Sequence, residues 1–487
     1  MGRADQTKKV AVQNGRDKYK ELSKNTLLFS ISSFGSKLIG FLFVPIYTNV
    51  LSTAEYGSVD LATTTAQLLT PFLTLCIEDG ILRFSLDSNG RKEDTLRVAA
   101  RIILPSTLLL GFALVLVQRL HLFDITPNYY YFLYATYIMG VLNNSLLMYL
   151  KAADRVQIIT VCGLLNTLVA CISNILLLLV FKIGVNGYMI SYVSGYFVAN
   201  MGMLLFGHVF RDIRRGKYEK KLAREMVAYS MPMAVISVAW WINYASDRYI
   251  LTFFCGTTIN GIYAIAYKIP HILNAVNGIV YQAWSISSIT EFDEKDKDGF
   301  ISNIFSLYLF ISVVCCSGIM LFNILLARIL YANEFFIAWK YVPPLLVGSA
   351  FYGLAQFEGC FFTAARDTKT FARTMIISAI INTVLNFVLI PFCGAFGAAL
   401  ATMIAHSSTF FIRWFKLKRI LELRIKLQPI LISFFLLLFQ CAAATISKNF
   451  LYQLPAVFAL LIVNRKSLLE CIHLFREKFA SKIMGKH

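Results

Sequence analysis

Residues 156–181 read VQIITVCGLLNTLVACISNILLLLVF, a run of 26 residues without a charged side chain. Arg155 precedes this run and Lys182 follows it. The hydrocarbon core of a bilayer is about 30 Å thick, and about 20 apolar residues cross it as a helix. The run is therefore long enough to span a membrane as one helix.

Fourteen stretches able to form membrane-spanning helices occur in the 487-residue chain. They cover residues 25–48, 57–77, 98–118, 129–150, 156–181, 187–209, 227–254, 261–289, 300–326, 341–364, 371–391, 396–412, 427–445 and 450–464. At about 20 residues each they occupy roughly 280 residues. The composition agrees, since 57% of the residues are hydrophobic and 15% are charged. We therefore predict an all-α polytopic membrane protein with about 14 transmembrane helices.

Lys and Arg fall almost entirely on one side of these stretches. If the N-terminus is cytoplasmic, 38 of the 46 basic residues lie on the inner side. The outer loops then hold five, namely Arg119, Lys182, Arg328, Lys340 and Lys448. Cytoplasmic loops of membrane proteins carry such an excess of basic residues. The net charge of +19 therefore indicates topology rather than nucleic-acid binding.

Neither a cleavable signal nor a metal or cofactor site is expected. Residues 1–24 are polar and basic, but the apolar stretch that follows is too long for a signal peptide and lacks an Ala-x-Ala-like site. The ten cysteines are scattered and form no Cys-x-x-Cys pair, so they are interpreted as small apolar packing residues.

Four short patterns recur in the same order at offsets of 204 to 212 residues. They are Gly184-Val185-Asn186-Gly187 with Gly394-Ala395-Phe396-Gly397, Ala152–Arg155 with Ala364–Asp367, Asn174 with Asn386, and Glu55-Tyr56-Gly57 with Asn260–Tyr263. Six helices per copy is an even number, so both copies enter the membrane from the same side. Parallel repeats of this kind are related by an axis along the membrane normal.

The repeat predicts two six-helix bundles related by pseudo-two-fold symmetry, followed by two C-terminal helices. The predicted organisation is a basic cytoplasmic N-terminus (1–24), the first bundle (25–210), a cytoplasmic linker (211–226), the second bundle (227–412), a basic loop (413–426), helices 13 and 14 (427–464) and a basic cytoplasmic C-terminus (465–487).

Several motifs resemble one family of membrane transporters. They are Ser36-Lys37-Leu38-Ile39-Gly40, Pro45–Leu51, Glu55-Tyr56-Gly57, Arg83-Phe84, Gly261-Ile262-Tyr263 and Gly394-x-x-Gly397-Ala398-Ala399. Together they are similar to the polysaccharide transporters, the Wzx-type lipid-linked oligosaccharide flippases of the multidrug/oligosaccharidyl-lipid/polysaccharide (MOP) exporter superfamily. The resemblance implies two bundles around a cavity that opens alternately inward and outward. It implies a lipid-linked oligosaccharide as substrate, with polysaccharide polymerase and glycosyltransferases as possible partners.

Lys37 is the first candidate substrate-binding residue. It lies about twelve residues into the first predicted helix, near the midplane, and Ser32, Ser36 and Gly40 lie on a polar face beside it. A charged side chain near the bilayer centre costs about 2.5–3.5 kcal/mol on insertion scales, so its presence requires a reason. The phosphate or pyrophosphate of a lipid-linked oligosaccharide would be bound by such a cation.

Arg248, Lys268 and Arg83 are the other candidate substrate-binding residues. Arg248 and Lys268 flank the short turn between helices 7 and 8 at similar offsets, which places them at similar depth in the outer third of the membrane. Snorkelling to headgroups, or pairing of Arg248 with Asp247, is the alternative interpretation. Arg83 ends helix 2 at the inner face, where ordinary anchoring at the membrane surface is the alternative.

Glu358 and Asp247 are the candidate ion-coupling residues. A proton- or sodium-coupled exporter needs a carboxylate that can lose its water and titrate. Glu358 lies a turn or two inside the inner end of helix 10, and we expect it to have no basic neighbour. Glu78 and Asp79 are expected to pair with Arg83 at the interface.

Two other functions remain as alternatives. A cation-coupled multidrug exporter of the same superfamily would be expected to carry a carboxylate in helix 1, but residues 25–54 contain none and contain Lys37 instead. A non-transporting scaffold for polysaccharide-synthesis enzymes would not need polar faces within its helices. A membrane-embedded enzyme is disfavoured because no nucleophile–base or metal-ligand pattern occurs.

The charge distribution predicts that both termini are cytoplasmic. Reporter fusions after Lys220 and after Lys486 should behave as cytoplasmic, and a fusion near Ala332 should behave as external, because an even number of helices returns the chain to its starting side. A reporter after Lys486 that behaves as external would contradict the helix count, most directly at 450–464.

Overall fold

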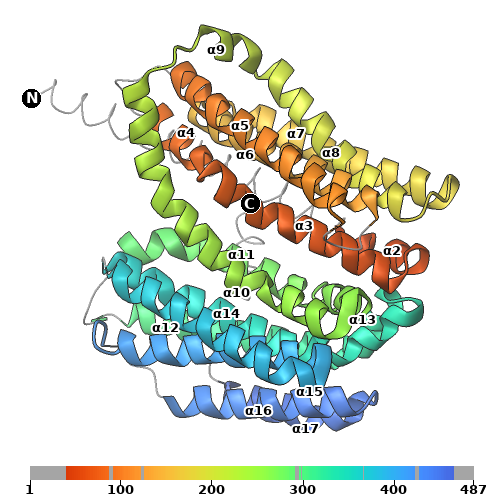
Figure 1. Ribbon diagram of the computed structural model, residues 1–487. Helices are drawn as coiled ribbons and strands as arrows, with labels where there is room; N and C mark the ends of the chain where they lie inside the picture. The colour runs from red at the N-terminus through yellow and green to blue at the C-terminus, as the bar shows by residue number, and fades with distance from the viewer. Residues whose placement is uncertain are drawn as a thin grey trace, which may run out of the picture. The chain divides into compact units, whose positions relative to one another are not determined.

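The computed structural model describes residues 40–86, 92–121, 126–290, 296–297, 299–365, 367–422 and 427–465. Within these ranges the chain forms helices and no β-strand, which confirms the all-α class (Figure 1). Two compact units are present, unit 1 with residues 1–43 and 61–238, and unit 2 with residues 44–60 and 239–487. The predicted bundle boundaries at 25–210 and 227–412 stay a prediction.

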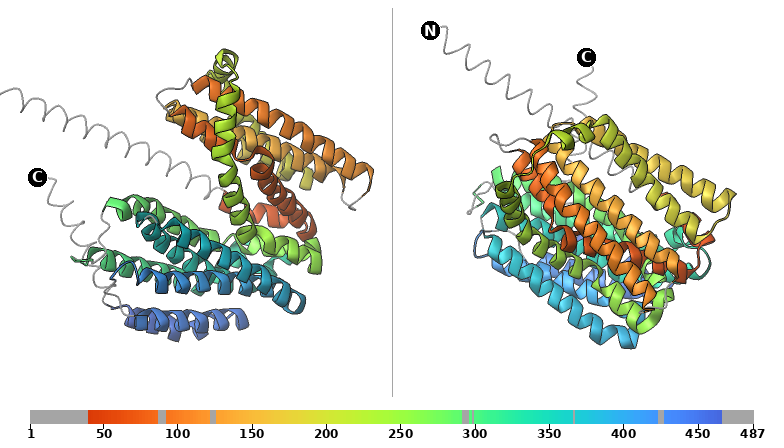
Figure 2. Two further views of the ribbon diagram at one scale, coloured as in Figure 1. Left: turned by 60° about the vertical axis from the view of Figure 1, so that its left-hand side comes forward. Right: turned by 45° about the horizontal axis from the view of Figure 1, so that its top comes forward.

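Unit 1 is built from antiparallel helices that pack in succession. They are α4 (Ile77–Ser85), α5 (Lys92–Arg119), α6 (Pro127–Ala152), α7 (Val156–Asn174) with the π-helical η1 (Ile175–Val180), α8 (Val185–Phe206) and α9 (Val209–Arg215). Helix α6 contacts α4, α5 and α8, and α8 also contacts α7 (Figures 1 and 2). Two longer helices, α3 (Thr53–Thr74) and α10 (Lys220–Ala266), each contribute to both units.

Unit 2 is organised around α14 (Val342–Ala364). The other helices are α2 (Val44–Val50), α11 (Pro270–Thr290), α12 (Phe300–Leu321), α13 (Asn323–Leu330), η2 (Asn333–Lys340), α15 (Thr368–Leu417), α16 (Leu427–Ile446), η3 (Phe450–Gln453) and α17 (Leu454–Val463). Helix α14 contacts α11, α12, α15 and α16. Its apolar span is 89% buried, against 11% for α5, so α14 forms the centre of this unit.

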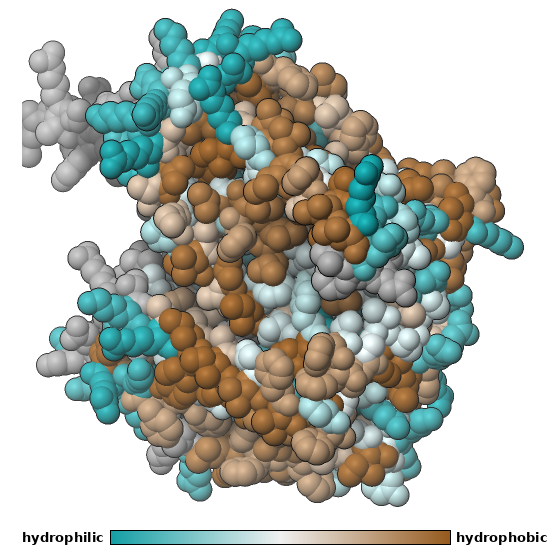
Figure 3. Space-filling view, in the orientation of Figure 1, coloured by the Kyte–Doolittle hydropathy of each residue, from teal (hydrophilic) through white to brown (hydrophobic). Residues whose placement is uncertain are grey.

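Hydrophobic side chains cover the outside of the helices as well as their packed faces. Phe253, Phe392 and Ile446 are 82%, 86% and 83% exposed. In each unit the hydrophobic surface lies along the helices, and hydrophilic side chains gather near the helix ends (Figure 3). Soluble proteins rarely expose apolar patches of this extent. With nine described helices long and apolar enough to cross a bilayer, the chain is a multi-pass membrane protein, and the total of 14 spans stays a prediction.

The two predicted Gly-x-x-Gly turns share one unusual backbone conformation. Gly184 has φ 66° and ψ −141°, and Gly394 has φ 56° and ψ −136°. Only glycine adopts this region without a steric penalty. In both turns the second glycine then packs closely on the preceding helix, Gly187 on Leu177 and Gly397 on Leu389. The backbone at these turns therefore repeats with the sequence, although the superposition of the two halves stays a prediction.

A second pair of repeated glycines makes a reciprocal helix contact within unit 2. A Cβ on Gly57 of α3 would lie 2.0 Å from the carbonyl oxygen of Thr257 in α10. A Cβ on Gly261 of α10 would lie 1.9 Å from the carbonyl oxygen of Thr53 in α3. Both helices thus present Thr-x-x-x-Gly, a small-residue spacing that allows backbones to approach closely in membranes. The contact is reciprocal, as expected for two equivalent positions of a parallel repeat.

Hydrogen bonds at the α2–α3 corner hold it to the rest of unit 2. Thr48 Oγ1 donates to the Leu330 carbonyl oxygen at 2.9 Å, and Thr53 Oγ1 donates to Glu334 Oε2 at 3.1 Å. The Tyr56 and Phe335 rings meet edge to face, 5.9 Å between centroids. The start of α3 is therefore fixed against α10, α13 and η2.

We predict that Gly57→Ala destabilises the protein. The added methyl must separate α3 from α10, and strain of this kind costs about 1–3 kcal/mol. Gly278→Ala in α11 is the matched control, because a Cβ there meets no atom within 4 Å and alanine favours a helix over glycine. The measurement is the thermal melting of purified protein in detergent. Equal melting temperatures for the two variants would contradict the close helix contact.

Candidate functional site

The glycine contact brings a carboxylate of α3 to a buried arginine of α10. Asp60 lies one helical turn after Gly57, and Arg248 is only 8% exposed. Arg248 Nη1 donates to Asp60 Oδ1 at 2.5 Å, and Asn260 Nδ2 donates to the Gly57 carbonyl oxygen at 3.2 Å. The sequence interpretation missed Asp60, although it lies within the predicted helix 57–77. It offered Asp247 as the partner of Arg248.

Asp247 is held mainly by tyrosines instead. Tyr263 lies near the end of α10 and Tyr267 directly follows that helix. Their hydroxyls donate to Asp247 Oδ2 at 2.6 and 3.2 Å. The backbone N–H of Arg248 donates to Asp247 Oδ1 at 2.9 Å. Both oxygens of this buried carboxylate therefore already accept hydrogen bonds, and the role of Asp247 in ion coupling stays a prediction.

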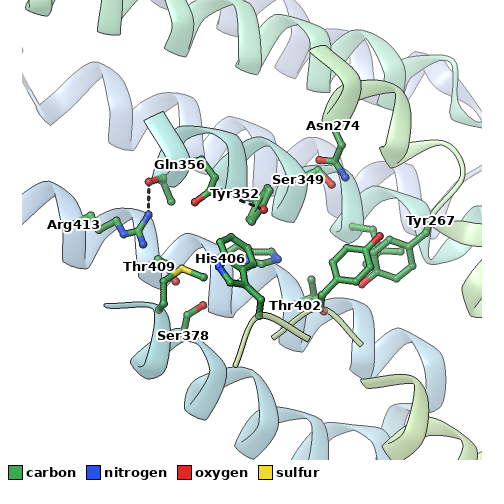
Figure 4. Close-up of a pocket in the computed structure, with 15 residues that line it drawn as sticks. Tyr267, Asn274, Ser349, Tyr352, Gln356, Ser378, Thr402, His406, Thr409 and Arg413 are labelled. Carbon is green, nitrogen blue, oxygen red and sulfur yellow. Dashed lines mark hydrogen bonds between the residues drawn. The ribbon is translucent and has the colours of Figure 1, made fainter. Parts of the chain in front are cut away.

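A pocket lies between α10, α11, α14 and α15 inside unit 2 (Figure 4). Its lining combines aromatic rings with hydroxyl, amide and imidazole groups, from Trp240, Tyr244, Tyr267, Asn274, Ser349, Tyr352, Gln356, Ser378, Thr402, His406, Thr409 and Arg413. Its free volume is about 50 Å³. A water molecule needs only about 10–15 Å³ of such space, so the pocket can hold a few waters or a small ion in this conformation.

Arg413 is the charged group of this pocket, and the sequence interpretation missed it. It was assigned to the basic loop 413–426, whereas α15 continues to Leu417 and the side chain is fully buried. Its Nε donates to Thr374 Oγ1 at 2.9 Å and its Nη1 to the Ala355 carbonyl oxygen at 2.5 Å. Nη2 has no partner among the described residues.

The spacing of polar residues along α15 is the signal that could have found Arg413. Thr402, His406, Thr409 and Arg413 follow one another at intervals of four, three and four residues. Residues at these intervals lie on one face of a helix. The labelled side chains accordingly point to the same pocket (Figure 4). A polar face that includes Arg413 argues for a helix that extends past 412.

Glu358 lies fully buried on α14, close enough to Arg413 for the two charges to interact. The expectation that Glu358 has no basic neighbour was therefore wrong, because Arg413 had been placed outside the helix. Within the described part of the chain neither Oε1 nor Oε2 accepts a hydrogen bond. A buried ionised carboxylate requires pairing or hydrogen bonds, and Arg413 is a basic group near enough to interact with Glu358.

The other predicted site residues are dispersed. Lys37 lies outside the described residues. Lys268 is half-buried in the turn between α10 and α11, and its backbone N–H donates to the Ile265 carbonyl oxygen at 2.9 Å. Arg83 is exposed near the end of α4 in unit 1. Among the described residues no ion pair joins Arg83 to Glu78 or Asp79. The structure thus brings together Arg248 with Asp60 and Glu358 with Arg413.

Residues 22–285, more than half of the chain, match the family described as polysaccharide biosynthesis protein. The chain belongs to this family. A Haloferax volcanii protein named "Probable low-salt glycan biosynthesis flippase Agl15" is 26% identical over 195 residues. The match spans 38% of this chain and 40% of that protein, so it covers less than half the length of the relative.

Solved structures show which fold this family member adopts. Lipid II flippase MurJ in an inward closed conformation has a TM-score of 0.61 at 16% identity, covering 93% of this chain and 100% of that chain. An inward-facing MATE family transporter of the MOP superfamily also has a TM-score of 0.61, at 11% identity, covering 81% and 98%. A MOP superfamily transporter from Pyrococcus furiosus scores 0.55 at 12% identity, covering 81% and 94%. These likenesses concern the fold, and they confirm the predicted resemblance to the MOP exporters.

We predict that Glu358 and Arg413 are energetically coupled. Arg413→Met should lower the melting temperature strongly, because removing one partner of a buried pair costs about 3–5 kcal/mol. Combining it with Glu358→Gln should recover part of that loss, since the uncompensated carboxylate is then gone. A double-mutant cycle from thermal melts in detergent measures the coupling. Strictly additive effects would show that the two charges do not compensate each other.

Proposed function

We propose that the chain is a flippase that moves a lipid-linked oligosaccharide from the inner to the outer leaflet of the cytoplasmic membrane by alternating access. The substrate would be a polysaccharide repeat unit on a polyprenyl phosphate or pyrophosphate. Membership of the polysaccharide biosynthesis family, the flippase named among its relatives and the fold shared with lipid II flippase MurJ support this function.

The observation that carries the proposal is the arginine pocket of unit 2. Aromatic faces from Trp240 and Tyr352 stand beside amide and hydroxyl groups, and Arg413 keeps one guanidinium N–H without a partner in the described chain. Such a lining suits a ligand with hydroxyl groups, apolar faces and an anion. A pocket for cationic drugs would instead be expected to present a carboxylate, and the described residues that line this pocket include none, which is the reason to prefer the oligosaccharide.

The pocket is too small for an oligosaccharide in the described conformation. A free volume of about 50 Å³ is far below the roughly 300–1,000 Å³ of ordinary ligand pockets. Substrate binding therefore requires the helices around the pocket to separate. This is consistent with a transporter that opens its cavity in alternation, and we propose that Arg413 contacts the substrate anion as the pocket opens.

Arg248 would take part at a later stage. In the described conformation the Asp60 carboxylate occupies its guanidinium, so a substrate phosphate must displace that carboxylate. An arginine that exchanges one oxyanion for another preserves its charge pairing throughout. Lys37, Lys268 and Arg83 remain candidate substrate contacts.

Glu358 is our candidate for coupling transport to a proton or sodium ion. Its two oxygens accept no hydrogen bond within the described chain, whereas those of Asp247 already do. A carboxylate without donors can accept a proton or a dehydrated cation. The neighbouring Arg413 would then be released from Glu358 and would be available to the substrate phosphate, which links the ion to the substrate.

This function requires no catalytic step, so we propose that the protein is not an enzyme. Both termini would lie in the cytoplasm. Glycosyltransferases that assemble the repeat unit at the inner leaflet and a polymerase that uses it at the outer leaflet would be its functional partners.

We predict that Lys37→Ala and Arg413→Gln each abolish surface polysaccharide when compared with the wild type at equal levels of inserted protein. Loss of a cation from a cavity of low dielectric removes much of the attraction for a phosphate. Lys37→Arg should retain part of the activity, because its charge is kept while the geometry changes. Lys418→Gln is the matched control, since Lys418 is exposed near the end of the same helix.

Two quantities are measured for each variant. One is the amount of surface polysaccharide, and the other is the leaflet in which the lipid-linked precursor accumulates. We expect the lipid-linked precursor to accumulate in the inner leaflet of the inactive variants, and we expect normal export in the Lys418→Gln control. Normal export by stably inserted Lys37→Ala and Arg413→Gln proteins would remove these residues from the site. Loss of polysaccharide with no precursor accumulating in either leaflet would instead contradict the flippase function.

A further inference from the structure

Two lysines converge on a single tryptophan at one end of unit 2, away from the arginine pocket. Lys340 ends η2, and Lys448 follows α16. Each ammonium nitrogen lies 5.9 Å from the centre of the Trp339 ring, and Lys448 Nζ lies 5.4 Å from the centre of the Phe336 ring. The Trp339 side chain is nearly buried, at 4% exposed, so the two cations gather around a fixed aromatic face.

This arrangement places two positive charges near one ring, and neither lysine forms an ion pair among the described residues. The attraction of an ammonium to an aromatic face is about 0.5–1 kcal/mol at exposed sites, and two like charges near one ring repel each other. The ion pairs found in the described chain, Arg155–Asp212, Arg211–Asp212 and Arg248–Asp60, include neither lysine. An anion that contacts both ammonium groups would relieve this repulsion.

The lysines border a groove that is much larger than the arginine pocket. Its volume is about 750 Å³. Besides the lysines, its lining combines aromatic rings and hydroxyls, from Trp339, Tyr341, Phe396, Thr445 and Ser447. Thr445 and Ser447 could donate to an anion together with the lysines. The groove therefore has the size and the donors that a headgroup requires.

The rim of the groove is apolar and faces outward. Ile446, one of the lining residues, is 83% exposed, and Phe450 and Leu451 of the next turn are 53% and 55% exposed. The groove lies where α16 ends, at the boundary of a helix that is apolar enough to cross the bilayer. Aromatic and basic side chains at this depth are typical of the membrane–water interface. The polar headgroup of an amphipathic ligand would contact the hydrogen-bond donors of the groove, and its apolar chains would contact the exposed apolar side chains at the rim.

We propose that this groove binds the phosphate headgroup of an anionic membrane phospholipid. Both ammonium groups would contact the phosphate oxygens in charge-assisted hydrogen bonds. The acyl chains would lie against Ile446 and the exposed side chains of η3. The site differs from the arginine pocket in residues and location, and it does not depend on the proposed transport function.

The test is a lipid titration with purified full-length protein in detergent, followed by native mass spectrometry. Phosphatidylglycerol should bind the wild-type protein more tightly than phosphatidylcholine does. The double variant Lys340→Gln with Lys448→Gln should weaken the tightest phosphatidylglycerol site about thirtyfold, at about 1 kcal/mol per lysine. The variant with both lysines changed to arginine should retain that site, because the charges are kept.

The matched control removes two other exposed basic residues, in Lys182→Gln with Arg328→Gln, which lowers the net charge equally. It should leave the tightest site intact. Equal weakening by this control would mean that net charge alone attracts the lipid and would overturn the proposal. Displacement of phosphatidylglycerol by an equal concentration of inorganic phosphate would also overturn it, because the site would then recognise phosphate without the lipid.

Discussion

The hydrocarbon core of a membrane offers neither water nor counter-ions, so every charged side chain placed there must be compensated by the protein itself. In the described part of unit 2, Asp60 pairs with Arg248, and Arg413 lies buried near Glu358. Both cases depend on close helix packing. Asp60 reaches Arg248 because Gly57 and Gly261 let α3 approach α10, and Arg413 reaches Glu358 because α14 and α15 pack along their length.

Unit 1 uses its charges differently. Among the described residues of unit 1, ion pairs join Arg155 of the α6–α7 turn and Arg211 of the short helix α9 to Asp212. Tyr149 also donates to Asp212, at 3.0 Å. These contacts fasten the connection that leads into α10, rather than forming a charged centre inside the helices. Among the described residues, the buried charged groups that we consider for substrate and ion binding therefore lie in unit 2.

The helices were predictable from sequence because their determinants are local. Long apolar runs between basic loops placed them, and the repeated glycines marked turns whose backbone only glycine adopts without penalty. The family resemblance was predictable from the same motifs. The charge partners were not, because Asp60 and Arg248 lie far apart in the chain and meet only through a helix contact. Arg413 was misplaced because a basic residue near a helix end satisfies the positive-inside pattern whether it lies inside or outside the membrane.

We propose that this chain moves a phosphate-linked oligosaccharide across a bilayer through the arginine-containing pocket of unit 2. The most direct test of this proposal is transport in liposomes that contain only purified protein and a fluorescent lipid-linked oligosaccharide, with a membrane-impermeant quencher reporting the leaflet. We predict that the wild-type protein accelerates the exchange of the labelled lipid between leaflets. At an equal amount of reconstituted protein, the exchange rate with Arg413→Gln should equal that of protein-free liposomes. Exchange that is equally fast with Arg413→Gln and with the wild type would contradict the account.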